Sequence, residues 1–519
     1  MLVAPFLFHF FKGVTSFLFS VNQEKTTYSF LKKVCYILFI MRDVIIIGAG
    51  AVGAFIARSL SQYQASVLVL EKENDVCDET SMANSAIAHS GYDPVPGTKK
   101  AKFNVLGNQM MKEVCLDLDV PFSMCGTLTV AVYENQLPLL KELEKRGEEN
   151  GVPTRILTAE EVKKLEPNIN PEVKGALLCP TGGIVNPFLL VTHAFENALD
   201  NGVELKLNEE VVGITRVDDH FLVKTKEHEF ETKVVINAAG VHSDDIAAMV
   251  EPIDWSIHAR KGEYYVLDHY AKGLVNHVLF PLPSEKGKGI LVTMTTSGNY
   301  LVGPSSEWVD DKEDKSTDTL TLLNVKEQAK TLVPNIPFPQ QIRVYSGLRA
   351  TPSTHDFIIE PSKKYENFIN VAGIESPGLV SSPAIGEYVA NELVKKVLPL
   401  EKNPHYCAKV KPYAKPLEMT LEERNELIKK NPHFGKLICN CEKVSLGEIE
   451  DVLSRSVPTN SIKALKKRTR AGFGKCQGGF CQPLVLEILA KEKGVSPLDV
   501  PYDGKGSEIL LEEVKKEAK

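Results

Sequence analysis

Three glycines close to position 50 constrain the fold of this chain more than any other feature of its sequence. Gly48, Gly50 and Gly53 form a G-x-G-x-x-G pattern that follows an apolar stretch at 43–47 and opens a helix-like stretch at 51–63. In such a turn the first glycine makes the tight bend, the second lets the backbone approach a pyrophosphate, and the third lets helix and strand pack closely. The N–H groups at the helix N-terminus can bind that pyrophosphate. The pattern predicts a dinucleotide site.

The residue that ends the next apolar run strengthens this prediction. Glu71 follows the stretch 67–70, and it lies about 20 residues beyond the glycines, where a carboxylate that binds ribose is expected. The fingerprint alone is compatible with either FAD or NAD. It therefore predicts the kind of site and leaves the cofactor open.

Length and composition limit the classes of protein to consider. A chain of 519 residues is too long for one core and predicts two or three domains. The net charge of −7, without a long basic run, argues against nucleic-acid binding. Ten cysteines in a chain of this length are no disulfide scaffold, and Cys77, Cys115, Cys125 and Cys179 are scattered. We expect a reducing, cytoplasmic compartment.

The first forty residues differ from the rest of the chain. They are rich in Phe and Leu, but His9, Lys12, Lys32 and Lys33 interrupt the apolar runs before the roughly 20 residues that a spanning helix needs. Three origins remain open: a targeting segment, an anchor on a membrane surface, or an upstream start codon. We favour Met41 as the functional start and expect membrane contact to be at most peripheral.

The order of predicted elements divides the remaining chain. Helix-like and strand-like stretches alternate over 41–400, with a strand-rich interval at 255–350. This predicts an α/β fold in which a Rossmann-like nucleotide domain is interleaved with an α+β substrate domain. Residues 401–435 are interpreted as a linker, 436–495 as a small and mainly helical domain that carries cysteines, and 496–519 as a charged tail.

Four cysteines in this small domain form two close pairs. Cys439-x-Cys441 is followed after 34 residues by Cys476-x4-Cys481. Sets of four thiolates bind iron–sulfur clusters or zinc, and the gap of one residue in the first pair argues against zinc. Glycines in the second loop let backbone N–H groups turn toward the sulfurs. Four cations add positive charge nearby: Lys466, Lys467, Arg468 and Arg470.

The region 41–400 resembles the glycine oxidase and D-amino-acid oxidase superfamily of FAD-dependent oxidoreductases. The resemblance rests on DVIIIGAGAVGAFIARSLS, TGGIVNPFLLVTHAFENALDNGVEL, VVINAAGVHSDDIA and GIESPGLVSSPAIGEYVA. It implies FAD as the cofactor, with Val212 beside the adenine and Ala239 and Gly240 near the diphosphate. It also implies that Gly373, Gly378 and Leu379 lie near the isoalloxazine, and that Thr80 and Ser81 contact the cofactor.

Within this superfamily the chain resembles the glycerol-3-phosphate dehydrogenases and the L-2-hydroxyglutarate dehydrogenases. The motifs are TSMANSAIAHSGYDPVPGTKKA, RKGEYYVLDH, LFPLPSEKGKGILVTMTTSGNYLVGPSS and YSGLRATP. The resemblance implies that Ser85 and His89 lie against the flavin, that Lys261 and Arg349 bind an anionic substrate, and that Ser376 lines the site. The chemistry agrees, since alcohol oxidation needs a base in the range of His and an anion needs fixed cations. Glu375 stands where a neutral polar residue is expected.

The segment 436–495 resembles the bacterioferritin-associated-ferredoxin-like 2Fe–2S domain, through ICNCEKVSLGEIEDVL and KRTRAGFGKCQGGFCQPLVLEILA. Such a domain behind an FAD domain also occurs in the anaerobic type of glycerol-3-phosphate dehydrogenase. The combination implies oxidation of sn-glycerol 3-phosphate, with electrons leaving through the cluster to a partner protein or a quinone. A 2-hydroxy acid or amine substrate remains an alternative, and so does a non-catalytic electron-transfer subunit.

Overall fold

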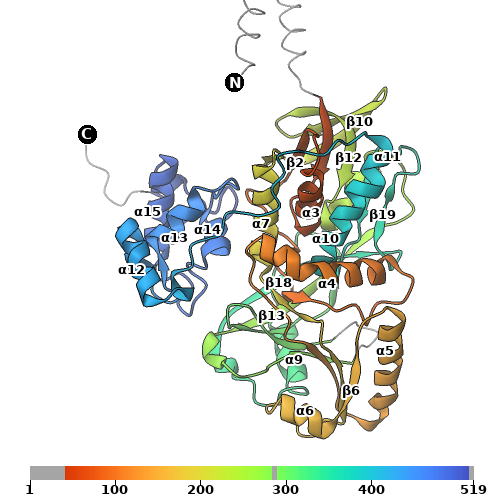
Figure 1. Ribbon diagram of the computed structural model, residues 1–519, viewed down its shortest axis with the longest axis vertical. Helices are drawn as coiled ribbons and strands as arrows, with labels where there is room; N and C mark the ends of the chain where they lie inside the picture. Colours follow the sequence, from red (N-terminus) through yellow and green to blue (C-terminus); the bar gives the residue numbers. More distant parts are fainter. Residues whose placement is uncertain (1–40, 283–288, 513–519) are drawn as a thin grey trace, which may run out of the picture.

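The computed structural model describes residues 41–282 and 289–512, so the expectations about residues 1–40 fall outside it. Figure 1 shows three parts: a nucleotide domain, a substrate domain below it, and a small module at the side. Within the described residues, no helix is both long and apolar enough to span a lipid bilayer. The predicted interleaved α/β architecture is confirmed.

The nucleotide domain is built on an eight-stranded sheet with a parallel centre. Its central strands, in spatial order, are β9 (Glu204–Lys206), β2 (Val67–Leu70), β1 (Arg42–Ile47), β12 (Glu229–Asn237) and β20 (Phe368–Ala372). The sheet is extended by β10 (Val211–Val217), β11 (His220–Thr225) and β19 (Ile358–Pro361). The expected strand–helix–strand unit is present, because α3 (Ala51–Leu60) connects β1 to β2.

The two faces of β1 contribute to two cores. Val44 and Ile46 pack with helices α3, α4 (Lys99–Asp117), α7 (Pro187–Asp200) and α10 (Gly378–Tyr388). Ile45 and Ile47 pack with residues of the β10–β11 hairpin and of α8 (Ser243–Ala248). This continuous apolar run therefore marks a strand buried on both faces, as is typical of parallel sheets.

The substrate domain is a nine-stranded, mostly antiparallel sheet. Its strands are β5 (Thr127–Ala131), β6 (Arg155–Thr158), β7 (Gly175–Cys179), β13 (Ile257–Leu267), β14 (Val278–Pro281), β15 (Leu291–Met294), β16 (Tyr300–Gly303), β17 (Glu307–Val309) and β18 (Gln341–Pro352). Residues of α6 (Ala159–Leu165) and α9 (Thr319–Ala329) pack in its main core, and α5 (Leu137–Glu149) packs in a smaller one. A three-stranded sheet of β3 (Ile87–Ala88), β4 (Phe122–Ser123) and β8 (Gly183–Val185) is separate from the two large sheets.

The C-terminal module is mainly helical, as expected. It contains α13 (Leu446–Leu453), α14 (Ile462–Thr469), α15 (Gln482–Lys493) and the short hairpin β21 (Leu437–Cys439) and β22 (Val444–Ser445), with α12 (Leu421–Lys430) preceding them. Local sequence explains the helix ends. Ser445 and Glu448 form a capping box at the start of α13, and Gly494 ends α15 in the left-handed conformation.

Buried ion pairs join the module to the nucleotide domain. Lys467 Nζ lies 2.7 Å from Asp75 and 2.8 Å from Asp78, and Arg468 Nη2 lies 2.6 Å from Asp75. Each of these side chains is at most 4% exposed. Burial on its own would raise the pKa of Asp75, yet Arg468 and Lys467 lower it to about 2. The attraction of the two cations therefore outweighs the desolvation of this carboxylate.

The segment between the two parts runs back along the nucleotide domain (Figure 1). The backbones of Lys402 and Tyr63 form an isolated antiparallel β-bridge, and Val410 N donates to Asp117 O. The Tyr413 ring then stacks on His193 at 4.4 Å between centroids. This segment is held by specific contacts at several points along its path.

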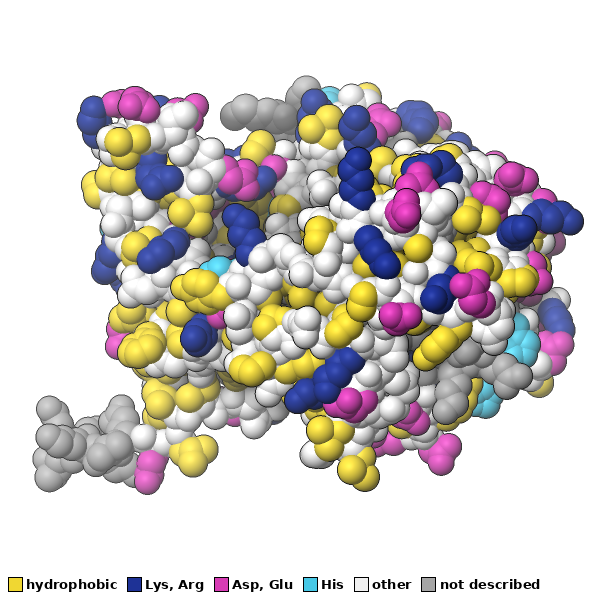
Figure 2. Space-filling view, turned by 90° about the horizontal axis from the view of Figure 1, so that it is seen from below, with side chains coloured by type: hydrophobic (Ala, Val, Ile, Leu, Met, Phe, Trp, Pro, Cys, Tyr) yellow, Lys and Arg dark blue, Asp and Glu magenta, His cyan; other side chains and the backbone are white. Residues whose placement is uncertain are grey.

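Basic and acidic side chains are interspersed on the face shown in Figure 2. No broad basic field covers this face, whereas nucleic-acid binding by bulk electrostatics would need one.

Candidate active site

The glycine turn has the close contacts that its pattern predicts. Gly48 has a φ of +106°, and a Cβ there would lie 2.5 Å from Ala238 O at the end of β12. A Cβ on Gly53 would lie 2.0 Å from Gly48 O. Gly50 caps α3 without a side chain, and Ser81 Oγ accepts from Ala51 N at 2.8 Å. The turn therefore leaves an open cradle at a helix N-terminus, which fits a pyrophosphate.

Glu71 is held against this turn. Its carboxylate accepts from Ala49 N at 2.6 Å and from Glu73 N at 2.9 Å. Burial raises the pKa of Glu71, although both backbone hydrogen bonds act in the opposite direction. Val212, on the edge strand β10, is 42% exposed for an apolar side chain, which leaves a surface on which an adenine could stack.

A cavity of about 500 Å³ begins at this turn and extends to the substrate domain. Its wall contains ten of the predicted residues: Gly50, Thr80, Ser81, Ser85, His89, Gly240, Arg349, Ser376, Gly378 and Leu379. They come from the glycine turn, the segments on both sides of β3, the end of β12, strand β18 and the start of α10. Segments more than 300 residues apart thus meet around one space large enough for a flavin ring and a small substrate.

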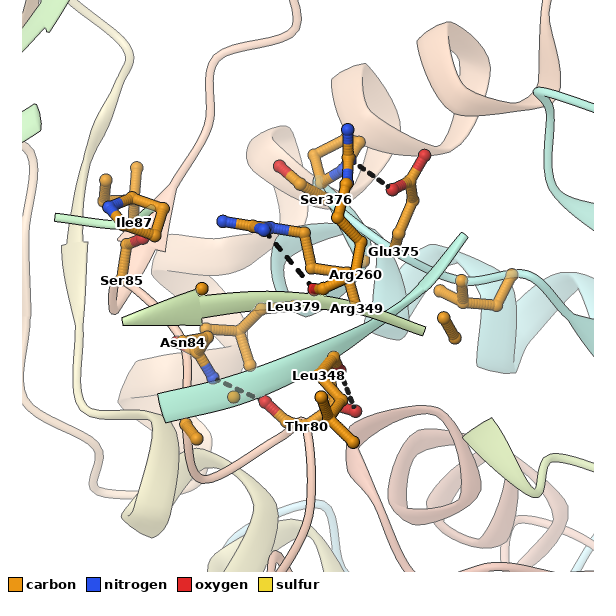
Figure 3. Close-up of a pocket in the computed structure, with 18 of the residues that line it drawn as sticks. Thr80, Asn84, Ser85, Ile87, Arg260, Leu348, Arg349, Glu375, Ser376 and Leu379 are labelled. Atoms are coloured by element: carbon orange, nitrogen blue, oxygen red, sulfur yellow. Dashed lines mark hydrogen bonds and ion pairs between the residues drawn. The ribbon is translucent and has the colours of Figure 1, made fainter. Parts of the chain in front are cut away.

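Two arginines and a carboxylate lie together in this wall (Figure 3). Arg260 on β13 and Arg349 on β18 are directly opposed in the antiparallel pair. Arg260 Nη2 donates to Glu375 Oε2 at 2.8 Å, and Lys100 Nζ donates to Glu375 Oε1 at 2.7 Å. Burial favours the neutral form of Glu375, but Lys100 and Arg260 lower its pKa. Glu375 is therefore a buried anion that holds two cations in place.

Arg349 has a different set of partners. Its guanidinium donates to Ser305 O at 3.2 Å and to Arg260 O at 3.4 Å, and no carboxylate among the described residues forms an ion pair with it. Burial lowers the pKa of Arg349, and the neighbouring Arg260 acts in the same direction. A Cβ on Gly262 would lie 2.6 Å from Arg349 Nη2, so the glycine lets the guanidinium cross β13. Arg349 is thus a cation with hydrogen-bonding capacity left for a bound anion.

The loop that carries the two residues expected beside the flavin is fixed from several sides. Ser85 Oγ and Tyr264 Oη share a hydrogen bond of 2.8 Å. His89 O accepts from Asn104 Nδ2 at 2.7 Å, and the His89 ring lies 5.7 Å from that of Phe280. His89 is the one histidine in the described cavity wall.

Helix α10 begins at the cavity. Ser376 and Pro377 precede it, Gly378 is its first residue, and Gly378 N donates to Glu375 O at 2.6 Å. Gly373 has a φ of +64° and lies between β20 and this helix. The positive end of the helix dipole therefore faces the space where the resemblance locates the isoalloxazine, and it favours negative charge there.

One of the residues predicted to bind the substrate lies elsewhere. Lys261 is not in the cavity wall, because side chains alternate along β13 and Arg260 and Gly262 face the cavity. Lys261 Nζ pairs with Asp314 Oδ2 at 2.8 Å on the other face. Arg260, Tyr264 and Lys100 were not singled out from the sequence. The glycine at 262 was the available sign in the sequence, since a glycine within a strand often marks a place where another group approaches the backbone closely. Residues 260 and 262 lie on the same face of the strand, and this face carries Arg260 and not Lys261.

The four cysteines of the module form two neighbouring pairs. Cys441 Sγ lies 3.6 Å from Cys476 Sγ, and Cys481 lies near Cys439. Backbone N–H groups of Gly478, Gly479 and Phe480 point to the Cys476 sulfur. Among the described residues, no group of three or more His, Cys, Asp or Glu side chains is close enough to hold a metal ion. Two pairs of thiols with surrounding N–H donors fit a two-iron cluster.

The fold and the cavity define a class of protein, the oxidoreductases that hold a flavin dinucleotide in a Rossmann-like domain. The sequence model described as "FAD dependent oxidoreductase" matches residues 43–392, and the chain belongs to this family. The model described as "BFD-like [2Fe-2S] binding domain" matches residues 437–491. FAD and a 2Fe–2S cluster are thus its cofactors, as the sequence predicted.

Several known proteins are similar to this chain. The glycerol 3-phosphate dehydrogenase of Caloramator mitchellensis is 44% identical over 92% of this chain and all of that protein. The glycerol 3-phosphate oxidase of Mycoplasma genitalium is 34% identical over 70% of this chain and 98% of that protein. The FAD-bound L-alpha-glycerophosphate oxidase of Mycoplasma pneumoniae, whose structure is solved, superimposes with a TM-score of 0.69 and 32% identity over 72% of this chain and all of that chain.

Proposed function

We propose that this enzyme oxidises sn-glycerol 3-phosphate to dihydroxyacetone phosphate, and that the electrons leave through the 2Fe–2S cluster to a partner protein or a quinone. The observation that carries the substrate is the cationic set in the cavity wall. Arg349 has no carboxylate partner among the described residues, and Lys100 and Arg260 share the single carboxylate of Glu375. Such a set suits a dianionic phosphate, and an Arg fork binds it with two hydrogen bonds.

In this proposal the chain's own residues orient the alcohol and accept its proton. FAD supplies the acceptor for the hydride from C2. His89 takes the proton of the C2 hydroxyl, since an imidazole titrates near neutral pH. Ser85, held by Tyr264, orients that hydroxyl, and Arg349 fixes the phosphate. The hydride and the proton leave together, and the C2–O bond becomes a carbonyl.

The remaining predicted residues have supporting roles in this proposal. Gly48, Gly50, Gly53, Ser81, Ala239 and Gly240 would contact the diphosphate, and Glu71 the ribose. The N-terminus of α10, with Gly378 and Leu379, would favour negative charge on the flavin ring. Ser376 would contact the substrate. Arg260 takes over the role that the sequence had suggested for Lys261.

The proposed exit through the cluster is supported by which relatives share the module. The Caloramator dehydrogenase matches along its whole length over 92% of this chain. The Mycoplasma genitalium oxidase is almost fully covered by 70% of this chain, which leaves no room for a second domain of this size. The name "dehydrogenase" thus accompanies the longer match and "oxidase" the shorter one.

Anaerobic mixing of the purified holoprotein with candidate substrates tests the chemistry. We expect glycerol 3-phosphate to bleach the flavin absorbance, and L-2-hydroxyglutarate and sarcosine to leave it unchanged. Replacement of Arg349 by Met should raise the KM for glycerol 3-phosphate by about 100-fold, and His89→Asn should lower kcat by about 100-fold or more. Lys363→Met, at a cation 75% exposed, is the control. Failure of glycerol 3-phosphate to bleach the flavin refutes the proposed substrate.

A second experiment separates the exit route from the chemistry. The variant Cys441→Ser/Cys476→Ser should lose the cluster signal in EPR but retain flavin bleaching by glycerol 3-phosphate. Turnover with an artificial acceptor that oxidises the cluster should then fall. Rapid, stoichiometric peroxide formation by the unaltered protein would contradict the cluster as the exit. A purely relaying subunit would keep its electron-transfer activity in His89→Asn, whereas an enzyme loses turnover.

A further inference from the structure

The basic run before the second cysteine pair contains four cations, and three of them are paired with carboxylates. The pairs are Lys467 with Asp75 and Asp78, Arg468 with Asp75, and Arg470 with Glu442. Two of these cations therefore join the module to the nucleotide domain. The third, Arg470, binds Glu442 within the module and also donates to Asn299 Oδ1 of the substrate domain at 3.0 Å. Lys466 is the remaining one, and no described carboxylate forms an ion pair with it.

Lys466 is deeply buried although it has no anionic partner in the described structure. The residue is 6% exposed, and its Nζ lies 4.7 Å from the centre of the Phe473 ring. A cation on so buried a side chain, with only an aromatic ring described beside it, is costly unless an anion compensates. Burial, together with Arg343 and Arg470, lowers the pKa of Lys466 to about 8.

The side chain of Lys466 lies along the loop that supplies two of the cluster ligands. Lys466 lines a small cavity together with Gly472, Gly478 and Cys481. A Cβ on Gly472 would be 3.8 Å from Lys466 Cδ. Phe473, beside the ammonium, stacks at 5.6 Å on Phe188 of the nucleotide domain. Lys466 thus lies on the inner side of the cluster site, toward the flavin domain.

We propose that Lys466 is the internal counter-charge of the 2Fe–2S cluster and raises its reduction potential. A cluster bound by four thiolates is anionic, and taking up one electron adds one negative charge. A fixed cation in a site of low dielectric stabilises the more negative state. The cluster becomes a better acceptor, which is what an electron exit requires. This inference rests on the proposed role of the cluster.

A redox titration of the full-length holoprotein tests the inference. Dithionite reduces the cluster by one electron, and EPR follows the reduced signal as a function of potential. Lys466→Met should weaken reduction by about tenfold in the equilibrium constant, a fall of 59 mV for a one-electron couple. Lys466→Arg keeps the charge and should keep most of the potential. Lys475→Met is the matched control, because Lys475 directly precedes Cys476 but is exposed, so that water screens its charge.

Three outcomes overturn the proposal: an unchanged potential in Lys466→Met, a shift in Lys475→Met of equal size, or a loss in Lys466→Arg equal to that in Lys466→Met. If Lys466→Met does not assemble the cluster, Lys466→Gln removes the same charge with a polar side chain, and its potential decides. Because dithionite replaces the substrate, the result does not depend on glycerol 3-phosphate. A failure of the proposed substrate is seen in flavin bleaching and not in this titration.

Discussion

The junction between module and nucleotide domain offers the sharpest test of the physical argument. Replacing Asp75 with Asn keeps the size of the side chain but removes the only carboxylate that pairs with Arg468 in the described structure. Arg468 is 1% exposed, so its charge would remain buried and unpaired. Breaking such a pair costs about 3–5 kcal/mol. At about 1.4 kcal/mol per factor of ten, this equals a shift of about 100-fold to about 4,000-fold in the docking equilibrium.

Hydrogen exchange of the backbone amides in α14 measures this shift, because the helix lies at the junction and is freed when the module undocks. We expect these amides to exchange about 100-fold faster or more in Asp75→Asn. Asp254→Asn is the control, since Asp254 and Lys363 are also 2.8 Å apart but 73% and 75% exposed. The double variant Asp75→Asn/Arg468→Met should recover part of the loss, because it leaves no unpaired arginine. Equal exchange in Asp75→Asn and in the control would refute the reasoning.

Three further outcomes follow from single contacts. Gly48→Ala places a Cβ 2.5 Å from Ala238 O at a φ of +106°. The purified protein should therefore lose most of its FAD, which is measured as flavin absorbance per protein. A full complement of FAD would contradict the role assigned to this turn. Gly262→Ala should displace the Arg349 guanidinium and raise the KM for glycerol 3-phosphate about tenfold or more, while the flavin content stays unchanged. An unchanged KM would exclude Arg349 as the phosphate ligand. Burial, above all, lowers the pKa of His193 from 6.5 to about 4. The folded state therefore binds fewer protons than the unfolded state, and the free energy of unfolding falls by about 3 kcal/mol as the pH is lowered from 6.5 toward 4. His193→Gln should flatten this decline in thermal unfolding, and a slope like that of the unaltered protein would assign the decline to other groups.

The sequence predicted best what depends on neighbours along the chain. The glycine turn between β1 and α3 needs only adjacent residues, and its geometry agrees with the pattern. The cysteine spacing indicated a cluster for the same reason, since each pair lies within one short loop. In Arg260 and Lys261, by contrast, two neighbouring cations look alike in the sequence. The register of β13 against β18 decides which of them faces the cavity.

Pairing across long separations was beyond sequence reasoning. Asp75 and Asp78 look like ordinary surface acids, and Lys467 and Arg468 look like charges that serve the cluster alone. The structure buries them against one another across almost 400 residues of chain. The sequence does not show whether a charged side chain is buried. The same ion pairs exposed to water would contribute little to stability.

The same junction limits how the chain can be divided. A fragment that ends near residue 400 would expose Asp75 and Asp78 without cations, Phe188 without the ring of Phe473, and Glu196 without Arg455. Such a fragment is therefore not equivalent to a shorter relative that never carried a module. The nucleotide domain of this chain thus depends on the module to neutralise the buried carboxylates of Asp75 and Asp78.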